Sequence, residues 1–275
     1  MSKKIKIDIN NKSCSYWDNI SEKYVLDEKL IRDNINKISW SVISEYQKLS
    51  EDFIKEFSNK VDWAYISSCQ NLSEDFIRKF YYKVEWCYIS KYQKLSEDFI
   101  REFYNNIDWW NAGIYQKLNQ EFIRENCHKL TPVCIARYQK LNPEFIKEYN
   151  LTIPETCWLY KDKEFKREHI KKYTKYKIIG DKVIAYKSCR SDGYSLYNFQ
   201  YYYKVGGEYK VHANYNINEE NSFGLSAWTK EQALQHHSTG KLFKVEIDLE
   251  DVAAIVCDRN KIRASKIKIL EEIKI

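Results

Sequence analysis

The side chains best suited to chemistry in this 275-residue sequence are eight cysteines and five histidines. No two cysteines form a Cys-x-x-Cys pair, so they predict free thiols in a reducing, cytoplasmic compartment rather than a zinc site. His236 and His237 are adjacent, and on a helix their side chains point about 100° apart, which does not suit a shared metal ion. Ser-His-Asp, P-loop and Rossmann patterns are missing from the sequence. We therefore expect neither a metal site nor a cofactor.

One segment, residues 161–177, concentrates positive charge, with eight basic and three acidic residues in a chain whose net charge is +6. Such a segment suits contact with phosphate or with an acidic partner, and its candidate partner-binding residues are Lys171, Lys172 and Lys175. The plainer interpretation is a solvated linker helix over 161–180.

Four polar or charged residues of the last hundred form a further candidate set: Arg190 after an early strand, Ser222 and Ser226 in a Ser-Phe-Gly-Leu-Ser segment that leads into a helix, and Glu246 on a late strand. In type and order they resemble the site of the ADP-ribosyltransferases. The resemblance implies that Arg190 anchors NAD, that a serine hydroxyl lies near the nicotinamide ribose, and that Glu246 stabilises an oxocarbenium-like centre. The alternative is that the apolar residues around the serines belong to a core and that Glu246 faces solvent. We favour this second, non-enzymatic interpretation.

The uneven distribution of glycine divides the chain into a helical part and a later part of strands and turns. Only Gly113 of the seven glycines precedes residue 175, and glycine is disfavoured inside helices but useful in tight turns. The fold class predicted is multidomain α+β, an N-terminal α-solenoid followed by a small α+β domain. The expected divisions are a strand or extension over 1–16, the solenoid over 17–160, the basic linker helix over 161–180 and the α+β domain over 181–275.

The helical part is a repeat of 23 residues. The phrase that begins Tyr-Gln-Lys-Leu-Ser at Tyr46 recurs at Cys69, Tyr92, Tyr115 and Tyr138. Tryptophans keep the same step, at Trp17, Trp40, Trp63, Trp86 and Trp109. A fixed period without insertions indicates stacked units, each of which is too small to bury its apolar side chains alone. We count six units between residues 17 and about 150.

The sequence pattern of each unit predicts two short helices. The second helix follows a good N-cap residue, and these caps are Asp27, Ser50, Ser73, Ser96, Asn119 and Asn142. Acidic residues come next, where the helix dipole favours them, and an apolar stripe such as Phe53, Ile54 and Phe57 follows. Helices of two to three turns are unstable alone, so stacking of successive apolar rows must stabilise them.

Three sets of repeated or varying polar and aromatic residues are candidates for function. A glutamine series from Gln47 to Gln139 is expected to bond to the turn between the helices. A basic series from Arg32 to Lys147 is expected to be ion-paired and solvated, because acidic residues flank it. Tyr65, Tyr88 and Trp110 differ in kind between units, and tyrosine and tryptophan make good interface anchors, so these three are further candidate partner-binding residues.

The last hundred residues predict strands and turns. Strands are expected over 183–189, 201–205, 208–212, 242–249 and 261–270, with a turn over 190–193 and a helix over 230–237 that Thr229 caps. Gly206-Gly207 is expected to join two of these strands as a hairpin.

The segments Phe243-Lys-Val-Glu-Ile, Asn260-Lys-Ile-Arg-Ala-Ser-Lys-Ile-Lys-Ile-Leu-Glu and Tyr203-Lys-Val-Gly-Gly-Glu-Tyr are similar to a small domain of phage and prophage proteins. The 23-residue units also resemble repeats of phage and giant-virus proteins. The resemblance implies viral or prophage origin and supplies no catalytic residues.

We expect a macromolecule-binding interaction protein whose partner is a host or phage protein, in one version an inhibitor of a host defence system such as CRISPR. An ADP-ribosyltransferase-like enzyme and a nucleic-acid-binding protein that uses 161–177 are the alternatives. No apolar run approaches the ~18 residues that span a bilayer, so we expect no membrane contact and a cytoplasmic location in the host cell.

Overall fold

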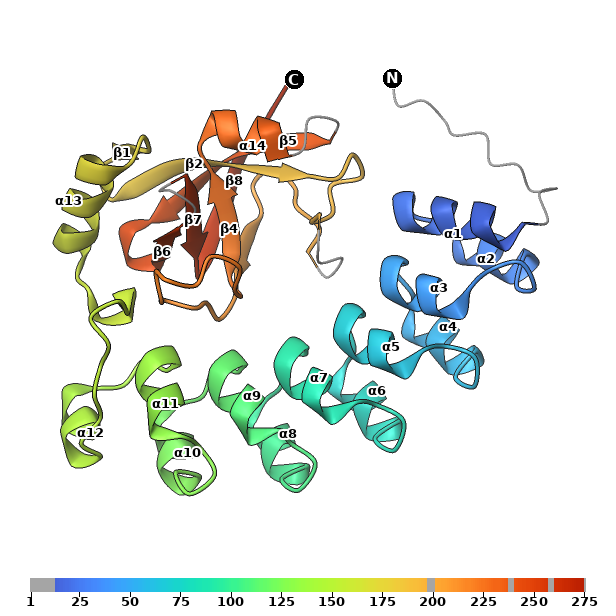
Figure 1. Cartoon of the computed structure of the whole chain (residues 1–275), viewed down its shortest axis with the longest axis horizontal. Helices are drawn as coiled ribbons and strands as arrows, with labels where there is room; N and C mark the ends of the chain where they lie inside the picture. The colour runs from blue at the N-terminus through green and yellow to red at the C-terminus, as the bar shows by residue number, and fades with distance from the viewer. Residues whose placement is uncertain (1–12, 197–200, 237–239, 257–259, 275) are drawn as a thin grey trace. The chain divides into compact units, whose positions relative to one another are not determined.

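A computed structural model describes residues 13–196, 201–236, 240–256 and 260–274 (Figure 1). These residues contain fourteen α-helices and an eight-stranded antiparallel sheet, so the fold class is α+β. None of the helices described is both long and apolar enough to cross a membrane. The strand predicted near the N-terminus falls almost wholly in residues 1–12, outside the described residues, and the first helix already begins at Cys14.

The chain divides into two compact units, Met1–Gln93 and Lys94–Ile275, so the boundary predicted near residue 180 lies inside the second unit. The first unit contains α1 (Cys14–Lys23), α2 (Glu28–Asp33), α3 (Trp40–Tyr46), α4 (Glu51–Glu56), α5 (Trp63–Cys69), α6 (Glu74–Lys79) and α7 (Trp86–Tyr92). The odd-numbered helices are the first helices of their repeats. They pack in sequence order, α1 on α3, α3 on α5 and α5 on α7 (Figure 1).

The second unit continues the 23-residue period. It contains α8 (Glu97–Glu102), α9 (Trp109–Tyr115), α10 (Gln120–Glu125), α11 (Pro132–Tyr138) and α12 (Pro143–Glu148). Here α9 packs on α11 as α5 packs on α7 in the first unit. The predicted repeat of paired helices is therefore confirmed.

The predicted N-caps explain where the second helices begin. The hydroxyl oxygen of Ser50 accepts a hydrogen bond from the amide of Phe53 at 3.2 Å, and the carboxylate of Asp27 accepts one from the amide of Lys29 at 2.7 Å. The same bond is made at Ser73, Ser96, Asn119 and Asn142. Each cap satisfies an amide that the helix leaves without a partner.

The glutamine series forms a buried link between neighbouring repeats, which we call the glutamine clamp. Oε1 of Gln70 accepts from the amide of Leu49 at 3.0 Å, while its Nε2 donates to the carbonyls of Ser44 at 2.9 Å and Gln47 at 2.7 Å. Gln139 makes the equivalent three bonds in the second unit. The predicted bond to the inter-helix turn is confirmed, and it reaches the turn of the preceding repeat.

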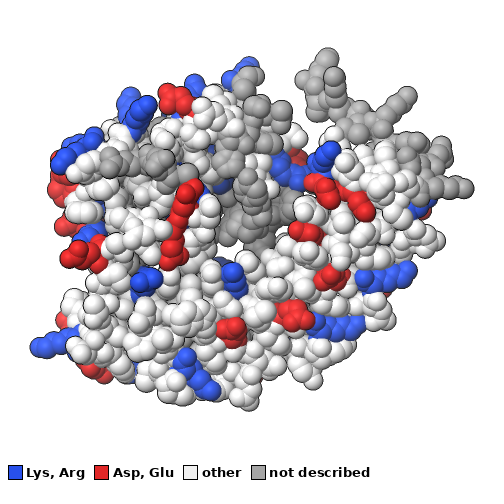
Figure 2. Space-filling view, in the orientation of Figure 1, with Lys and Arg blue, Asp and Glu red and all other residues white. Residues whose placement is uncertain are grey.

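The four arginines of the basic series are ion-paired, as predicted, whereas its lysines, Lys55 and Lys147, form no ion pair with a described residue. Arg101 lies 2.9 Å from Glu125, and Arg124 lies 2.9 Å from Glu148, one repeat further on in each case. Figure 2 shows basic and acidic side chains interleaved on the visible face. Exposed pairs of this kind contribute little stability each, so they serve solubility more than folding.

The predicted linker is shorter than expected and is bound to the sheet. It consists of α13 (Lys163–Tyr173), followed by β1 (Lys177–Ile179), which pairs with the next strand. The Lys166 ammonium is buried and donates to the carbonyls of Val252 at 2.7 Å and Glu250 at 3.2 Å. The expectation of a wholly solvated helix is therefore wrong at this residue.

The remaining strands are β2 (Lys182–Cys189), β3 (Glu208–Lys210), β4 (Leu225–Trp228), β5 (Lys241–Asp248), β6 (Val252–Val256), β7 (Lys261–Ala264) and β8 (Lys266–Ile273). Their order is β3-β8-β5-β2-β4-β7-β6, with β1 paired to β2. Alternate residues of β2 and β5 are buried, which gives the sheet a core face and an open face. A short helix, α14 (Lys230–His236), follows β4, and Thr229 caps it as predicted.

Two predictions in this region are wrong. Residues 201–205 do not form a hairpin with 208–212, because 201–203 bond back to 193–195 and β3 pairs with β8. The strand predicted over 261–270 is two strands, β7 and β8, that separate at Ser265, and β6 was not predicted.

Candidate functional site

The residues that resemble an ADP-ribosyltransferase site lie at separate places in the sheet domain. Glu246 of β5 is opposite Ile184 of β2, whereas Arg190 follows the last residue of β2. Six residues of strand therefore separate their positions, roughly 20 Å. Arg190 contacts Asp192 at 3.3 Å, and Glu246 contacts Lys268 at 3.6 Å.

The two serines of this resemblance are engaged elsewhere. The Oγ of Ser222 accepts a hydrogen bond from Asn214 at 2.8 Å. Ser226 lies on β4, with β2 between it and the strand of Glu246, and its carbonyl accepts from the buried Lys187 ammonium at 2.8 Å. The structure does not bring the four residues together.

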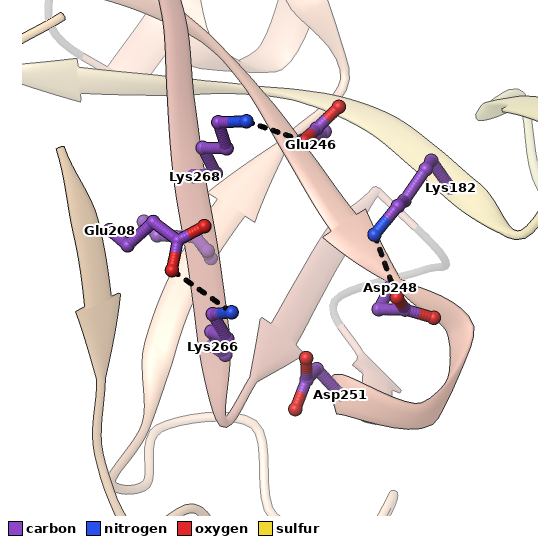
Figure 3. Close-up of a pocket in the computed structure, with 8 residues that line it drawn as sticks. Lys182, Glu208, Glu246, Asp248, Asp251, Lys266 and Lys268 are labelled. Atoms are coloured by element: carbon purple, nitrogen blue, oxygen red, sulfur yellow. Dashed lines mark hydrogen bonds and ion pairs between the residues drawn. The ribbon is translucent and has the colours of Figure 1, made fainter. Parts of the chain in front are cut away.

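Glu246 belongs to a charged area at one end of the open sheet face (Figure 3). Lys182 lies 2.7 Å from Asp248, and Lys266 lies 3.0 Å from Glu208. The hydrogen bond from Lys266 lowers the pKa of Glu208. The cavity among these side chains holds only about 40 Å³. Opposite charges from neighbouring strands neutralise each other here, which leaves little field to attract a ligand.

The predicted partner-binding aromatics are at least partly accessible on first helices. Trp110 of α9 is 57% exposed, Tyr88 of α7 is 38% exposed, and Tyr65 of α5 is half-buried, where Glu45 raises the pKa of its phenol. Tyr88 also contacts Tyr92, with ring centroids 6.1 Å apart. Tyr65 and Tyr88 occupy the same repeat position, whereas Trp110 lies one position earlier.

A further aromatic position was not singled out by the sequence, although it opens the repeated phrase. It is the last residue of the first helix, occupied by Tyr46, Tyr92, Tyr115 and Tyr138, and we call these residues the first-helix tyrosines. In the second unit, Tyr115 and Tyr138 contact the ring of Phe223, with centroid distances of 4.7 and 6.0 Å. Phe223 thus packs against α9 and α11.

Polar contacts accompany this packing. A ring nitrogen of His212 lies 3.0 Å from the carbonyl oxygen of Ile114, and burial lowers the pKa of His212 to about 4. The Tyr138 hydroxyl donates to Glu219 at 3.2 Å, and Arg137 lies 3.9 Å from the same carboxylate. The loop over 212–223 is therefore bound to the first helices through one aromatic ring, one imidazole and one carboxylate.

Arg263 of β7 holds this loop in shape. Its side chain is fully buried, and burial lowers the pKa of its guanidinium. It donates hydrogen bonds to four carbonyl oxygens of the loop, those of Asn214, Asn216, Glu219 and Glu220. Gly224 has a φ of 132°, and a side chain there would meet Cγ of Arg263 at 2.7 Å. A glycine is therefore required next to Phe223.

The three basic residues predicted to bind a partner have different surroundings. Lys171 is paired with Glu168 at 3.0 Å, and the ammonium of Lys172 lies 4.9 Å from the ring centroid of Tyr173. Lys175 instead lines a cavity on the open sheet face.

Comparison with known protein families, curated proteins and solved structures finds no match for this chain.

Proposed function

We propose that this chain is a non-enzymatic interaction protein, in which the repeats form an α-solenoid that binds a protein partner through the first helices. The packing of successive first helices and the glutamine clamps between neighbouring repeats support the solenoid. The observation that carries the proposal is the loop over 212–223, because α9 and α11 already bind a polypeptide segment by their first-helix tyrosines.

The equivalent surface of α7 has the same chemistry. Lys91 and Tyr92 occupy the repeat positions of Arg137 and Tyr138, and Tyr92 is 43% exposed. A partner loop that presents an aromatic ring and a carboxylate, as Phe223 and Glu219 do in the second unit, fits this pattern. Exposed tyrosines beside a cation are well suited to such an interface.

A viral or prophage chain acting on a host protein in the host cytoplasm, for example on a defence system, is the specific form of this proposal. Its support is the sequence resemblance of the repeats and of the C-terminal segments to phage proteins. Binding of nucleic acid along 161–177 has less support, because Lys166 is buried and Lys163, Arg167 and Lys171 are ion-paired.

The test is capture of a partner from host lysate by the full chain and by two matched variants. We expect one stoichiometric partner that is lost in Tyr88→Ala/Tyr92→Ala. The control, Tyr81→Ala/Tyr82→Ala, removes another pair of exposed tyrosines in ring contact, which lies outside the first helices. The proposal fails if no partner is captured, or if both double variants bind it equally.

A further inference from the structure

The open sheet face has a second cavity, which we call the lysine groove. It is lined by Lys175, Tyr176, Lys177, Ile179, Ile184, Tyr186, Thr229, Lys230, Glu231 and Lys244. Its volume is about 340 Å³, within the range of sites for small organic ligands. Most of the lining comes from β1, β2, β5 and the first turn of α14, whereas Lys175 and Tyr176 belong to the segment that joins α13 to β1.

The charge of the groove is not neutralised as it is at the other end of the same face. Four lysines and one glutamate line it, and Lys244 is paired with Glu271 at 2.8 Å. Lys175, Lys177 and Lys230 form no ion pair with any residue in the described ranges. Lysines gathered around a concave surface without matching acids create a positive potential that attracts anions.

The floor of the groove includes apolar side chains from the sheet. Ile184 and Tyr186 project from β2 on the open face, opposite Lys177 of β1 and Lys244 of β5 in the strand register. The ring of Tyr186 packs against the buried cluster beneath α14, which contains Trp228 and Leu242. This packing restricts the ring before any ligand binds, and a restricted aromatic ring is a good stacking surface for a planar group.

We propose that the lysine groove binds a nucleotide, with the phosphate among Lys175, Lys177 and Lys230 and the base on Tyr186. A cationic rim above an apolar, aromatic floor matches a ligand that carries both a phosphate and a planar ring. A free mononucleotide and the phosphorylated end of an oligonucleotide share this chemistry. The site is separate from the first-helix surface, so the two proposals stand or fall independently.

The experiment is calorimetric titration of the full chain with AMP, adenosine, inorganic phosphate and a 5′-phosphorylated dinucleotide. We expect AMP to bind more tightly than adenosine or phosphate, because only AMP uses both the rim and the floor. Lys177→Gln/Lys230→Gln should weaken AMP binding about tenfold or more. Tyr186→Ala should weaken AMP binding and leave phosphate binding unchanged. The ratio of AMP to dinucleotide affinity identifies the source of the ligand.

The matched control is Lys171→Gln/Lys172→Gln, which removes the same charge from the neighbouring helix α13, outside the groove. This variant should bind AMP like the parent chain. The proposal is overturned if neither AMP nor the dinucleotide binds at about 1 mM, or if the two double variants weaken binding equally. Thermal unfolding of each variant establishes that it is folded, and Lys177→Gln alone replaces the double variant if that one is not.

Discussion

Replacing Gln70 by leucine tests the glutamine clamp. The side chain is buried, and its three hydrogen bonds satisfy the amide of Leu49 and the carbonyls of Ser44 and Gln47. Leucine has a similar size but no polar atom, so these three backbone groups lose their partner. At about 1 kcal/mol for each bond, and more for a buried group that water does not reach, we expect a loss of about 3 to 5 kcal/mol in unfolding free energy.

Urea unfolding gives this free energy, and hydrogen exchange at the Leu49 amide shows whether the loss is local. The matched control is Asn71→Leu, which makes nearly the same chemical change one residue further on, where the side chain is exposed. It should change stability by less than about 0.5 kcal/mol. A Gln70→Leu effect no larger than that of Asn71→Leu, with the Leu49 amide still protected, would refute the clamp as a source of stability.

Three further predictions concern buried cations and one imidazole. Arg263→Met leaves the loop carbonyls without donors, so it should lower stability by about 3 kcal/mol or more in urea unfolding and expose Phe223 to limited proteolysis. His212 has a pKa of about 4 when folded and about 6.5 when unfolded, so stability should fall as the pH drops from 6.5 towards 4, by about 2 to 3 kcal/mol; His212→Gln should flatten that part of the profile. Burial lowers the pKa of Lys166 to about 8, and the unfolded chain keeps this proton to higher pH, so stability should rise between pH 8 and 10. Parallel urea titrations of Lys166→Met should lack that rise.

The repeats could be predicted because their determinants are local. A cap such as Ser50, the acidic residues after it and the apolar stripe that follows all lie within one short helix. The 23-residue period then repeats these local signals in six units. Even the glutamine clamp was predicted in part, since a residue that recurs with the repeat is usually required by it.

The sheet was harder because its pairings are long-range. Gly206 and Gly207 have the composition of a hairpin turn, yet both bond to Ile269 of β8, more than sixty residues later. A strand buried throughout, such as β6, also lacks the alternation that marks a strand with one open face.

The candidate site was predicted only in part. Exposed aromatics on the first helices were expected, and Phe223 was assigned to a core; it does pack against a small buried cluster, but one on α9 and α11. Its real position depends on Arg263, a residue forty positions away that reaches four carbonyls of the loop. Short-range sequence patterns do not predict such a long-range contact.

The span of the glutamine clamp has a consequence for synthesis on the ribosome. Each clamp joins residues 21 to 26 positions apart, so a repeat can lock onto its predecessor soon after it leaves the exit tunnel. The sheet cannot assemble stepwise in this way, because β8, its last strand along the chain, lies between β3 and β5. The helices of the first unit should therefore be folded while the strands still await residue 273, and nascent chains arrested at increasing lengths would reveal that order.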